Sequence, residues 1–599
     1  MSGLFPWRAL AALVLFGSLM PAAHAGDGSS AELYDKAHSA ETQSVFDFIR
    51  TRTLASRSNM IEGQHMGGPG DLSSAPQVFD MNTYRIASAS PRRAYPRMIG
   101  ARYDANLDAT HYVLEQAYVS QINARLLDAS AIYHPIVSIT ATPPNPWDRN
   151  SGRSSSPKDK ALSKLFLSNR APDTPAGRFW DDIDTIADGL QTLSDAGIPV
   201  VFRPFAEVNT GEKYYADGKL PADFVTLWNQ VADYYVNQRH LHNLIFCWEA
   251  WVFHRTAATS DLDPWYPRDA AGKSSWVDVV SGAFYFLKGD TGFFKLEFPA
   301  GGNDERVFYS LMKLAVDNDK PFGAAQYAVN YKYAPPDDQT PCGYGDNANT
   351  LQFMTSIDAQ HSQPTALGPV QHLAFAYYWG DNKACMDVQS QAHATQFVDD
   401  VRVASITGID AVNTESGTVR DSPATPGAGA LATPGWPVRT GDTNGGAGGC
   451  KNCQSKAVLS FYTQQALPAD AVVGPSQPTL LLTQTATGAG TNPFAAGFAP
   501  LSIDAANRWF GGASGLAPED FSGADRPGVG QMSDPAQGPT QVLSHGSVPA
   551  NTINLTRGNG RTQYRVSFFK ATDGTNTNNY IDWNGAQSPP ELILTYTLP

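Results

Sequence analysis

Charged residues are scarce in this sequence, and basic ones are the scarcer kind. They make up 17% of the 599 residues, and 43 Lys and Arg stand against 57 Asp and Glu, which gives a formal net charge of -14. An acidic surface repels the phosphate backbone of nucleic acids. We therefore expect no nucleic-acid partner.

Several catalytic signatures are also missing. The chain has no Gly-rich phosphate loop, no HExxH helix and no GxSxG turn, so phosphoryl transfer, zinc proteolysis and α/β-hydrolase chemistry lack support. The segment "TDGTNTNN" offers oxygen ligands for calcium, but it does not follow the EF-hand pattern. We expect no metal and no cofactor.

Long apolar runs are confined to the amino end. There a single Arg8 precedes an apolar stretch over residues 9–20, and Ala23-His24-Ala25 forms a small-x-small cleavage site. A membrane anchor needs roughly 20 apolar residues, which this stretch does not reach. The pattern predicts a signal peptide over residues 1–25 and a secreted or periplasmic protein without a membrane segment.

Cysteine is rare, with five in the chain. In an exported protein this number predicts disulfides with one thiol left over. Cys342 and Cys385 could pair across loops of the larger domain. Cys450 and Cys453 lack two further zinc ligands nearby, which favours a local disulfide. Cys247 lies in an apolar run, where a free thiol behaves as a small hydrophobe.

Eight apolar segments, alternating with amphipathic helical patterns, dominate residues 40–405. This order predicts repeated β-α units and a (β/α)8 TIM barrel. The expected strands are "MIEGQHM", "RMIGARYD", "PIVSITA", "IPVVFRPF", "NLIFCWEAW", "WVDVVSGAFYF", "PFGAAQYAV" and "HLAFAYYW".

The composition changes after the predicted barrel. Residues 406–455 are rich in Gly, Pro and Thr without periodicity, which predicts a linker or opening loops. Residues 456–599 contain period-two apolar segments without helical patterns, which is typical of an all-β sandwich.

Polar side chains that directly follow a barrel strand are candidates for chemistry, since barrel active sites lie where strands end. In "VVFRPFAEVN", Arg203, Glu207 and Asn209 occupy such positions. A surface carboxylate paired with Arg203 is the plainer interpretation of Glu207 on this motif alone.

The neighbouring motifs carry a family resemblance. "DDIDTIADGLQTLSDAGIPVVFRPFAEVN" and "FVTLWNQVADYYVNQRHLHNLIFCWE" resemble glycoside hydrolase family 26, the β-mannanases and their relatives, and the likeness extends over roughly residues 45–400. The resemblance implies hydrolysis of a β-linked polysaccharide, with Glu207 as general acid/base. It also implies that Tyr285 supports the nucleophile.

The sequence departs from the family pattern at the nucleophile. The stretch "KPFGAAQYAVN" has Gln326 where the family has a carboxylate, and a retaining glycosidase needs a second carboxylate beside the acid. Ala206 replaces the usual His before the acid, and the third-strand His is also absent. These departures predict a remodelled site next to the cleavage point.

Four other carboxylates could replace the missing one: Glu249, Asp381, Asp261 and Asp263. Each is also readily interpreted as a loop or helix-capping acid. A carboxylate roughly 6.5–9.5 Å from Glu207 would permit an inverting mechanism with a water between the two groups.

Further cleft candidates follow apolar segments as well. Arg203 could bind a sugar hydroxyl or orient Glu207, while aromatic rings could stack on sugars or belong to the core. These candidates are Trp248, Trp251, Trp379 and, from the first strand, His65.

The β-rich end resembles the DNRLRE-type sandwich modules of extracellular polysaccharide enzymes, which implies a carbohydrate-binding module. Three functions remain open. The first is a secreted endo-glycoside hydrolase acting on a mannan-like or bacterial β-linked polysaccharide. The others are a catalytically silent carbohydrate-binding barrel of exopolysaccharide assembly or matrix, and a polysaccharide lyase.

Overall fold

The computed structural model describes most of the chain beyond the amino-terminal 32 residues. The described residues are 33–68, 72, 79–87, 92–104, 112–216, 218–252, 262–287, 295–296, 303–331, 346–361, 370–379, 387–422, 425–445, 450–513, 515–537, 542–556, 560–585 and 588–598.

Eight parallel strands form a closed barrel. Their order is β1-β4-β5-β6-β7-β8-β9-β10, and β10 pairs with β1 to close the sheet, with the short β11 (Val403–Ala404) added beside β1. All eight predicted strands are confirmed: β1 (Met60–His65), β4 (Met98–Tyr103), β5 (Ile136–Ala141), β6 (Val200–Arg203), β7 (Leu244–Trp251), β8 (Val279–Leu287), β9 (Phe322–Tyr331) and β10 (Phe375–Tyr378).

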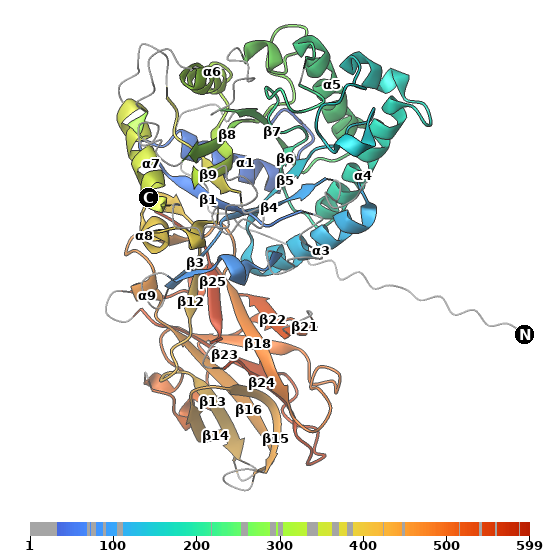
Figure 1. Cartoon of the computed structure of the whole chain (residues 1–599). Helices are drawn as coiled ribbons and strands as arrows, with labels where there is room; N and C mark the ends of the chain where they lie inside the picture. Colours follow the sequence, from blue (N-terminus) through green and yellow to red (C-terminus); the bar gives the residue numbers. More distant parts are fainter. Residues whose placement is uncertain are drawn as a thin grey trace, which may run out of the picture. The chain divides into compact units, whose positions relative to one another are not determined.

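Helices surround the barrel strands (Figure 1). They are α1 (Ala40–Thr53), α3 (Gln116–Tyr133), α4 (Pro175–Asp195), α5 (Pro221–Asp233), α6 (Asn303–Asp317), α7 (Asn347–His361) and α8 (Ala394–Asp399). The sequence sets the ends of α4: the Thr174 side chain accepts from the Gly177 N–H, Pro175 opens the helix, and Gly197 follows it with φ +70°. Its buried apolar side packs on the barrel.

Short helical turns connect these elements. They are η2 (Met81–Tyr84), η3 (Arg149–Ser151), η4 (Leu162–Leu165), η5 (Leu167–Asn169), η6 (Tyr234–Gln238, a π-helix), η7 (Asp263–Trp265), η9 (Val388–Ser390), η10 (Phe510–Gly512), η11 (Pro518–Phe521) and η12 (Ala550–Thr552).

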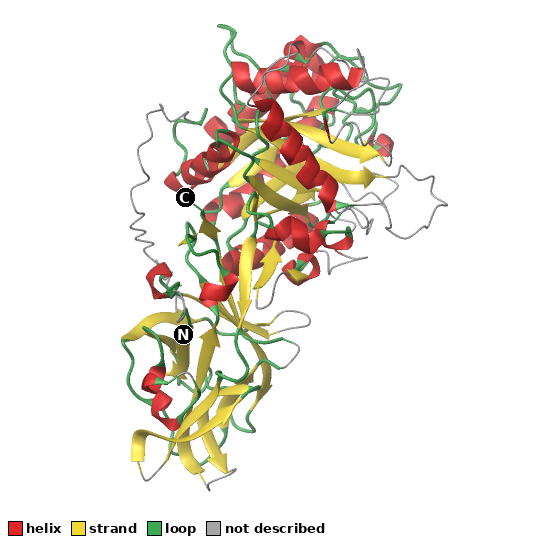
Figure 2. Cartoon of the chain, turned by 90° about the vertical axis from the view of Figure 1, so that its left-hand side faces the viewer, coloured by secondary structure: helices red, strands yellow, loops and turns green. Residues whose placement is uncertain are grey.

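The carboxyl-terminal part is an antiparallel β domain, which agrees with the predicted sandwich. In Figure 2 strands joined by loops predominate in it, whereas the barrel carries most of the helices. Its strands are β12 (Ile406–Asp410), β13 (Gly417–Ser422), β14 (Thr425–Pro434), β15 (Val438–Gly445), β16 (Cys450–Phe461), β17 (Val472–Val473), β18 (Thr479–Thr487), β19 (Leu501–Ala506), β20 (Arg526–Met532), β21 (Ala536–Gln537), β22 (Val542–Ser547), β23 (Thr562–Phe568), β24 (Asn579–Trp583), β25 (Glu591–Leu594) and β26 (Tyr596–Thr597), with the short helix α9 (Thr463–Ala466).

Residues 406–455, which the composition predicts to be a linker or loops, form strands instead. They contain β12 to β15 and the start of β16, and β15 pairs with both β16 and β24. Glycine is required where the chain packs closely: a Cβ at Gly429 would overlap the carbonyl of Pro518. Small residues such as Gly429 are therefore needed for the packing of this domain, although they remove the alternating apolar pattern of a strand.

A hairpin inserted in the barrel sequence belongs to the second sheet. Strands β2 (Ile86–Ala87) and β3 (Arg92–Tyr95) lie between β1 and β4 in the chain, but β3 pairs with β12. The Tyr95 hydroxyl donates to the Glu591 carboxylate at 2.8 Å, and Arg93 forms an ion pair with Asp410. Barrel and β domain thus share one sheet at this junction.

Cysteines follow the predicted pattern where the structure describes them. Cys450 and Cys453 form a disulfide, and Cys247 is free and buried. The predicted Cys342–Cys385 pair lies outside the described residues. Among the helices of the described part, none has both the length and the apolar character needed to cross a membrane.

Candidate functional site

Glu207 lies in the loop that follows β6, at the carboxyl-terminal end of the barrel. Its backbone has φ +58°, an uncommon conformation for a residue with a side chain. Hydrogen bonds on both sides hold it: the Val208 N–H donates to the Glu249 carbonyl at 3.1 Å, and the Thr210 N–H donates to the Glu207 carbonyl at 3.1 Å. The strain is thus maintained by the surrounding contacts, as is common at functional sites.

The Glu207 carboxylate is largely buried and paired. Lys213 Nζ lies 2.9 Å from Glu207 Oε2, and the two side chains are 12% and 11% exposed. Burial lowers the pKa of Lys213, while the Glu207 carboxylate acts in the opposite direction. The loop after β6 therefore supplies an acid together with its own cation.

A second carboxylate, Glu249 on β7, lies at the same end of the barrel. Arg203 Nη1 donates to Glu249 Oε2 at 3.0 Å and to the Ala325 carbonyl at 2.5 Å. Both charged side chains are buried, with 1% and 0% exposure. Burial raises the pKa of Glu249 to about 7, Arg203 opposes this shift, and the charge of Glu207 adds to it.

Gln326 on β9 lies next to this ion pair. The Tyr285 hydroxyl on β8 donates to Gln326 Oε1 at 2.7 Å, and the Tyr285 ring stacks on Trp251 with 5.0 Å between centroids. Tyr285 thus supports the residue at position 326, although that residue is an amide. Arg203, through Ala325, contacts the backbone next to the same position.

Two further predicted residues, Trp379 and His65, are buried side by side. Trp379 is 8% exposed, and its ring lies 4.1 Å from the ring of the fully buried His65. Burial and the nearby arginines Arg102, Arg203 and Arg153 hold the pKa of His65 well below its ordinary value, so the ring is neutral.

Trp248 and Asn209 have structural surroundings. Trp248 is completely buried and contacts Tyr266 edge-on, which is the core alternative rather than a sugar-stacking surface. The Asn209 side chain both accepts from the Trp251 N–H at 2.7 Å and donates to its carbonyl at 2.9 Å. Its amide joins the loop after β6 to the end of β7.

Of the alternative carboxylates, Glu249 alone among the described ones lies beside Glu207. Asp263 is exposed and pairs with Arg268 at 2.8 Å. Asp381 and Asp261 lie outside the described residues.

Four charged residues near the site were missed at the sequence level. Asp104 follows β4 and is shared by two arginines, with Arg153 Nη1 at 3.2 Å and Arg102 Nε at 3.5 Å. Lys213 pairs with Glu207 from the same loop. Asp104 could have been found, since it directly follows an apolar strand segment, whereas Arg153 and Lys213 lie in irregular loops.

Comparison with known proteins finds a sequence family that matches this part of the chain. Residues 35–296 match the sequence model of glycosyl hydrolase family 26. This match covers less than half of the chain. The match contains Glu207, Glu249 and Tyr285 and ends before Gln326.

Curated proteins similar to the chain are mannan endo-1,4-beta-mannosidases. One from Caldalkalibacillus mannanilyticus is 24% identical over 280 residues, 45% of this chain and 50% of that protein. One from Bacillus subtilis is 31% identical over 112 residues, 17% of this chain and 28% of that protein. The chain thus spans half or less of the length of these relatives.

Solved structures similar to the chain include a Bacillus subtilis mannanase, with 17% identity and a TM-score of 0.44. The alignment covers 62% of this chain and 95% of that one. The YdhT protein of Bacillus subtilis gives the same identity and coverage with a TM-score of 0.45.

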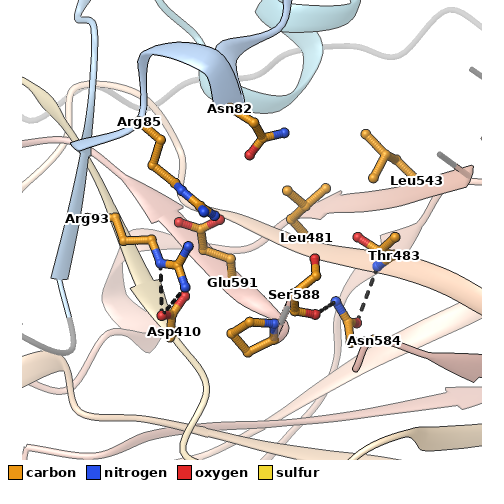
Figure 3. Close-up of a pocket in the computed structure, with 11 residues that line it drawn as sticks. Asn82, Arg85, Arg93, Asp410, Leu481, Thr483, Leu543, Asn584, Ser588 and Glu591 are labelled. Atoms are coloured by element: carbon orange, nitrogen blue, oxygen red, sulfur yellow. Dashed lines mark hydrogen bonds and ion pairs between the residues drawn. The ribbon is translucent and has the colours of Figure 1, made fainter. Parts of the chain in front are cut away.

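A separate pocket lies outside the family 26 site, at the junction with the β domain (Figure 3). It has a volume of about 160 Å³. In Figure 3 the side chain of Arg85 lies beside Glu591, and Arg93 points to Asp410. Burial raises the pKa of Glu591 to about 7, with the Tyr95 hydrogen bond opposing the shift. Among the residues that the structure describes, no aromatic side chain lines the pocket, so we interpret it as part of the junction rather than as a sugar-stacking site.

Proposed function

We propose that this protein hydrolyses a β-linked polysaccharide of the mannan type, with Glu207 as general acid/base. The observation that carries the proposal is the position of Glu207. It is a buried carboxylate in a strained loop at the carboxyl-terminal end of β6, inside the family 26 match. The mannan-hydrolysing relatives support the substrate class.

Two carboxylates of the site are candidates for the roles that glycosidic cleavage needs. A general acid must protonate the leaving oxygen while a second group stabilises or attacks the oxocarbenium-like centre. Glu207 can serve as the acid, and Glu249 is the second carboxylate near it. Tyr285 and Trp251 provide a stacked aromatic pair beside Gln326, a suitable surface for a sugar ring.

The test of this proposal is the release of reducing ends from 1,4-β-mannan. General acid catalysis is typically worth about 10²–10⁴-fold, so Glu207→Gln is expected to lower kcat by roughly that factor while the polymer remains bound. Glu41→Gln, the same change on an exposed residue of α1, serves as the control. Near-normal turnover by Glu207→Gln would exclude Glu207 as the acid.

A silent carbohydrate-binding barrel is the second candidate, and one observation favours it. Tyr285 donates to the amide of Gln326 where the family resemblance implies a nucleophilic carboxylate. An amide oxygen is a poor nucleophile and carries no charge to stabilise a cationic transition state. Binding of mannan without release of reducing ends would favour this function.

We further propose that the protein is exported and that its β domain binds polysaccharide. The apolar amino end with its Ala-His-Ala site supports export. Amino-terminal sequencing of protein from the culture medium or periplasm should begin at Gly26. An uncleaved chain retained in the cytoplasm would contradict export.

A further inference from the structure

A further pocket lies in the β domain, where several of its strands begin or end. It has a volume of about 160 Å³, and its lining includes Asn507, Arg526, Asn551 and Asn554. Asn507 directly follows β19, Arg526 opens β20, and the other two belong to η12 and the turn after it. Ala505 of β19 pairs with Arg526 in the sheet. The pocket therefore rests on the ends of paired strands.

The polar groups of this pocket hold one another and keep donors for a ligand. Arg526 Nη1 donates to the Asn551 carbonyl at 2.8 Å and to its Oδ1 at 3.1 Å, and Asn554 Nδ2 donates to the Asn507 carbonyl at 3.4 Å. Within the described part of the chain, Arg526 makes no ion pair, and the side-chain amide of Asn507 makes no hydrogen bond. Amide and guanidinium groups of this kind can bind hydroxyls.

A half-buried tryptophan stands beside the pocket. Trp509 comes two positions after Asn507, and its ring lies 5.9 Å from the Arg561 guanidinium carbon. Arg561 directly precedes Thr562, whose hydroxyl accepts from the Asn554 N–H at 2.8 Å. The pocket and the indole ring thus share neighbours at the start of β23.

The backbone that carries Trp509 is fixed by the residue after it. The Phe510 N–H donates to Gln563 Oε1 at 2.7 Å, and the Phe510 side chain is buried. A ring held on such a backbone loses little conformational freedom when a ligand stacks on it. Trp509 is therefore suited to serve as a binding surface.

Arg561 supports this part of the domain without packing closely on Trp509. It donates to Glu415 through Nε and Nη2, at 3.1 and 3.3 Å, and its guanidinium carbon lies 3.4 Å from the centroid of the Tyr462 ring. The corresponding distances to the Trp509 ring are 5.9 Å from Arg561 and 5.6 Å from the exposed Arg508. Neither arginine stacks on the indole as Arg561 does on Tyr462.

An aromatic ring next to amide and guanidinium donors matches the chemistry of a sugar chain. The apolar face of a pyranose packs on an indole, and its hydroxyls both donate and accept hydrogen bonds. A nucleobase also stacks on aromatic rings, but the net charge of -14 disfavours a nucleic acid.

We propose that Trp509 and the adjacent pocket form a second polysaccharide-binding site, which holds the polymer that the barrel acts on. One sugar stacks on Trp509, and the next along the chain places its hydroxyls against Asn507, Asn551 and Arg526. The inference rests on the proposed mannan hydrolysis for the identity of the polymer. A second contact on the same chain raises the effective concentration of polymer at the barrel.

The experiment measures binding of the full chain to insoluble 1,4-β-mannan, with Glu207→Gln present throughout so that the polymer stays intact. Trp509→Ala should weaken binding by about tenfold or more, because it removes the stacking surface, and Trp509→Tyr should keep most of the affinity. Asn507→Ala should weaken binding by about 2- to 10-fold through loss of one hydrogen bond. Its side chain makes no hydrogen bond within the described residues, so its melting temperature should match that of the parent.

Phe569→Ala is the control variant. Phe569 is 81% exposed and directly follows β23, at the opposite end of that strand from Arg561. Its removal should leave binding unchanged, whereas a loss equal to that in Trp509→Ala would indicate nonspecific adsorption and overturn the inference.

Two further results would overturn it: no retention of the parent on mannan, or unchanged retention of both Trp509→Ala and Asn507→Ala. Reducing-end release from soluble mannohexaose by the chain with Glu207 intact separates this inference from the proposed hydrolysis. Cleavage together with unchanged retention of the two variants leaves the hydrolysis standing and removes the second site. Retention that depends on Trp509 without any cleavage leaves the second site standing and removes the hydrolysis.

Discussion

At the scale of single residues, the site combines a predictable acid with an unexpected distribution of charge. Arg203 and Glu207 were identified from their positions at the end of an apolar segment. Gln326 was identified from the family resemblance and Glu249 as a possible replacement carboxylate. The structure places these residues at the same end of the barrel. The ion pair between Arg203 and Glu249 could not be predicted from the sequence, because Arg203 contacts residues of two other strands, β7 and β9. Such contacts depend on barrel closure, which local sequence patterns do not specify.

The Arg203–Glu249 pair leads to a prediction about stability. Glu249→Gln leaves the Arg203 guanidinium buried without its carboxylate, and loss of one partner of a buried pair typically costs about 3–5 kcal/mol. The free energy of unfolding, measured by denaturant titration near pH 9, where a carboxyl with a pKa of about 7 is ionised, should fall by this amount. Asp263→Asn, which breaks an exposed ion pair, should change it by less than about 1 kcal/mol.

Adding Gln326→Glu to Glu249→Gln should restore much of that loss. Arg203 Nη1 already contacts the carbonyl of Ala325, so a carboxylate at position 326 would lie next to the same guanidinium. The double variant also places a carboxyl group next to the Tyr285 hydroxyl. Hydrolysis of mannan with retained anomeric configuration can then be measured in this variant. A double variant as unstable as Glu249→Gln would show that position 326 cannot neutralise Arg203.

At the scale of secondary-structure elements, the junction between β3 and β12 was the feature that sequence reasoning missed. All eight barrel strands were predicted because buried parallel strands are continuous apolar runs. β3 is the short segment "RRAY", which has no such pattern, and its partner lies more than 300 residues away. Pairing of this kind depends on the whole fold.

Glu591 at this junction predicts a pH-dependent stability. Its pKa is raised from 4.5 to about 7 because the carboxyl is buried. Below pH 4.5 both folded and unfolded states hold the proton, so stability is unaffected. Between about pH 4.5 and 7 the unfolded state loses the proton first, and the free energy of unfolding should fall by up to about 3 kcal/mol.

Glu591→Gln replaces the carboxyl by a neutral amide that can still accept from Tyr95. Between pH 5 and pH 8 the melting temperature of the variant should therefore fall less than that of the wild type. Glu519→Gln, at an exposed position of η11, is the control and should follow the wild type. An unchanged pH profile in Glu591→Gln would assign the dependence to other buried acids such as Glu62, whose pKa burial raises to about 8.

At the scale of the whole molecule, the limits of the β domain differ from those that composition predicts. A boundary at residue 456 cuts through β16 (Cys450–Phe461), which pairs with β13, β15 and β23. It also removes β12, which pairs with β25. A fragment of residues 456–599 would expose strand edges and apolar surface that the complete domain buries.

We therefore expect residues 456–599 to aggregate or remain unfolded when expressed alone, and residues 406–599 to fold. The longer fragment keeps β12 to β16 but lacks β3, so it should unfold at a lower temperature than the β domain in the full chain. Circular dichroism with thermal melting distinguishes these outcomes, and retention on immobilised mannan and on bacterial β-linked polysaccharides tests whether the folded fragment binds polysaccharide. A cooperative melt of residues 456–599 would show that β12 to β15 are dispensable. If the folded 406–599 fragment binds none of these polysaccharides, the β domain lacks the predicted affinity for polysaccharide. The barrel would then be the part of the protein that binds the polymer.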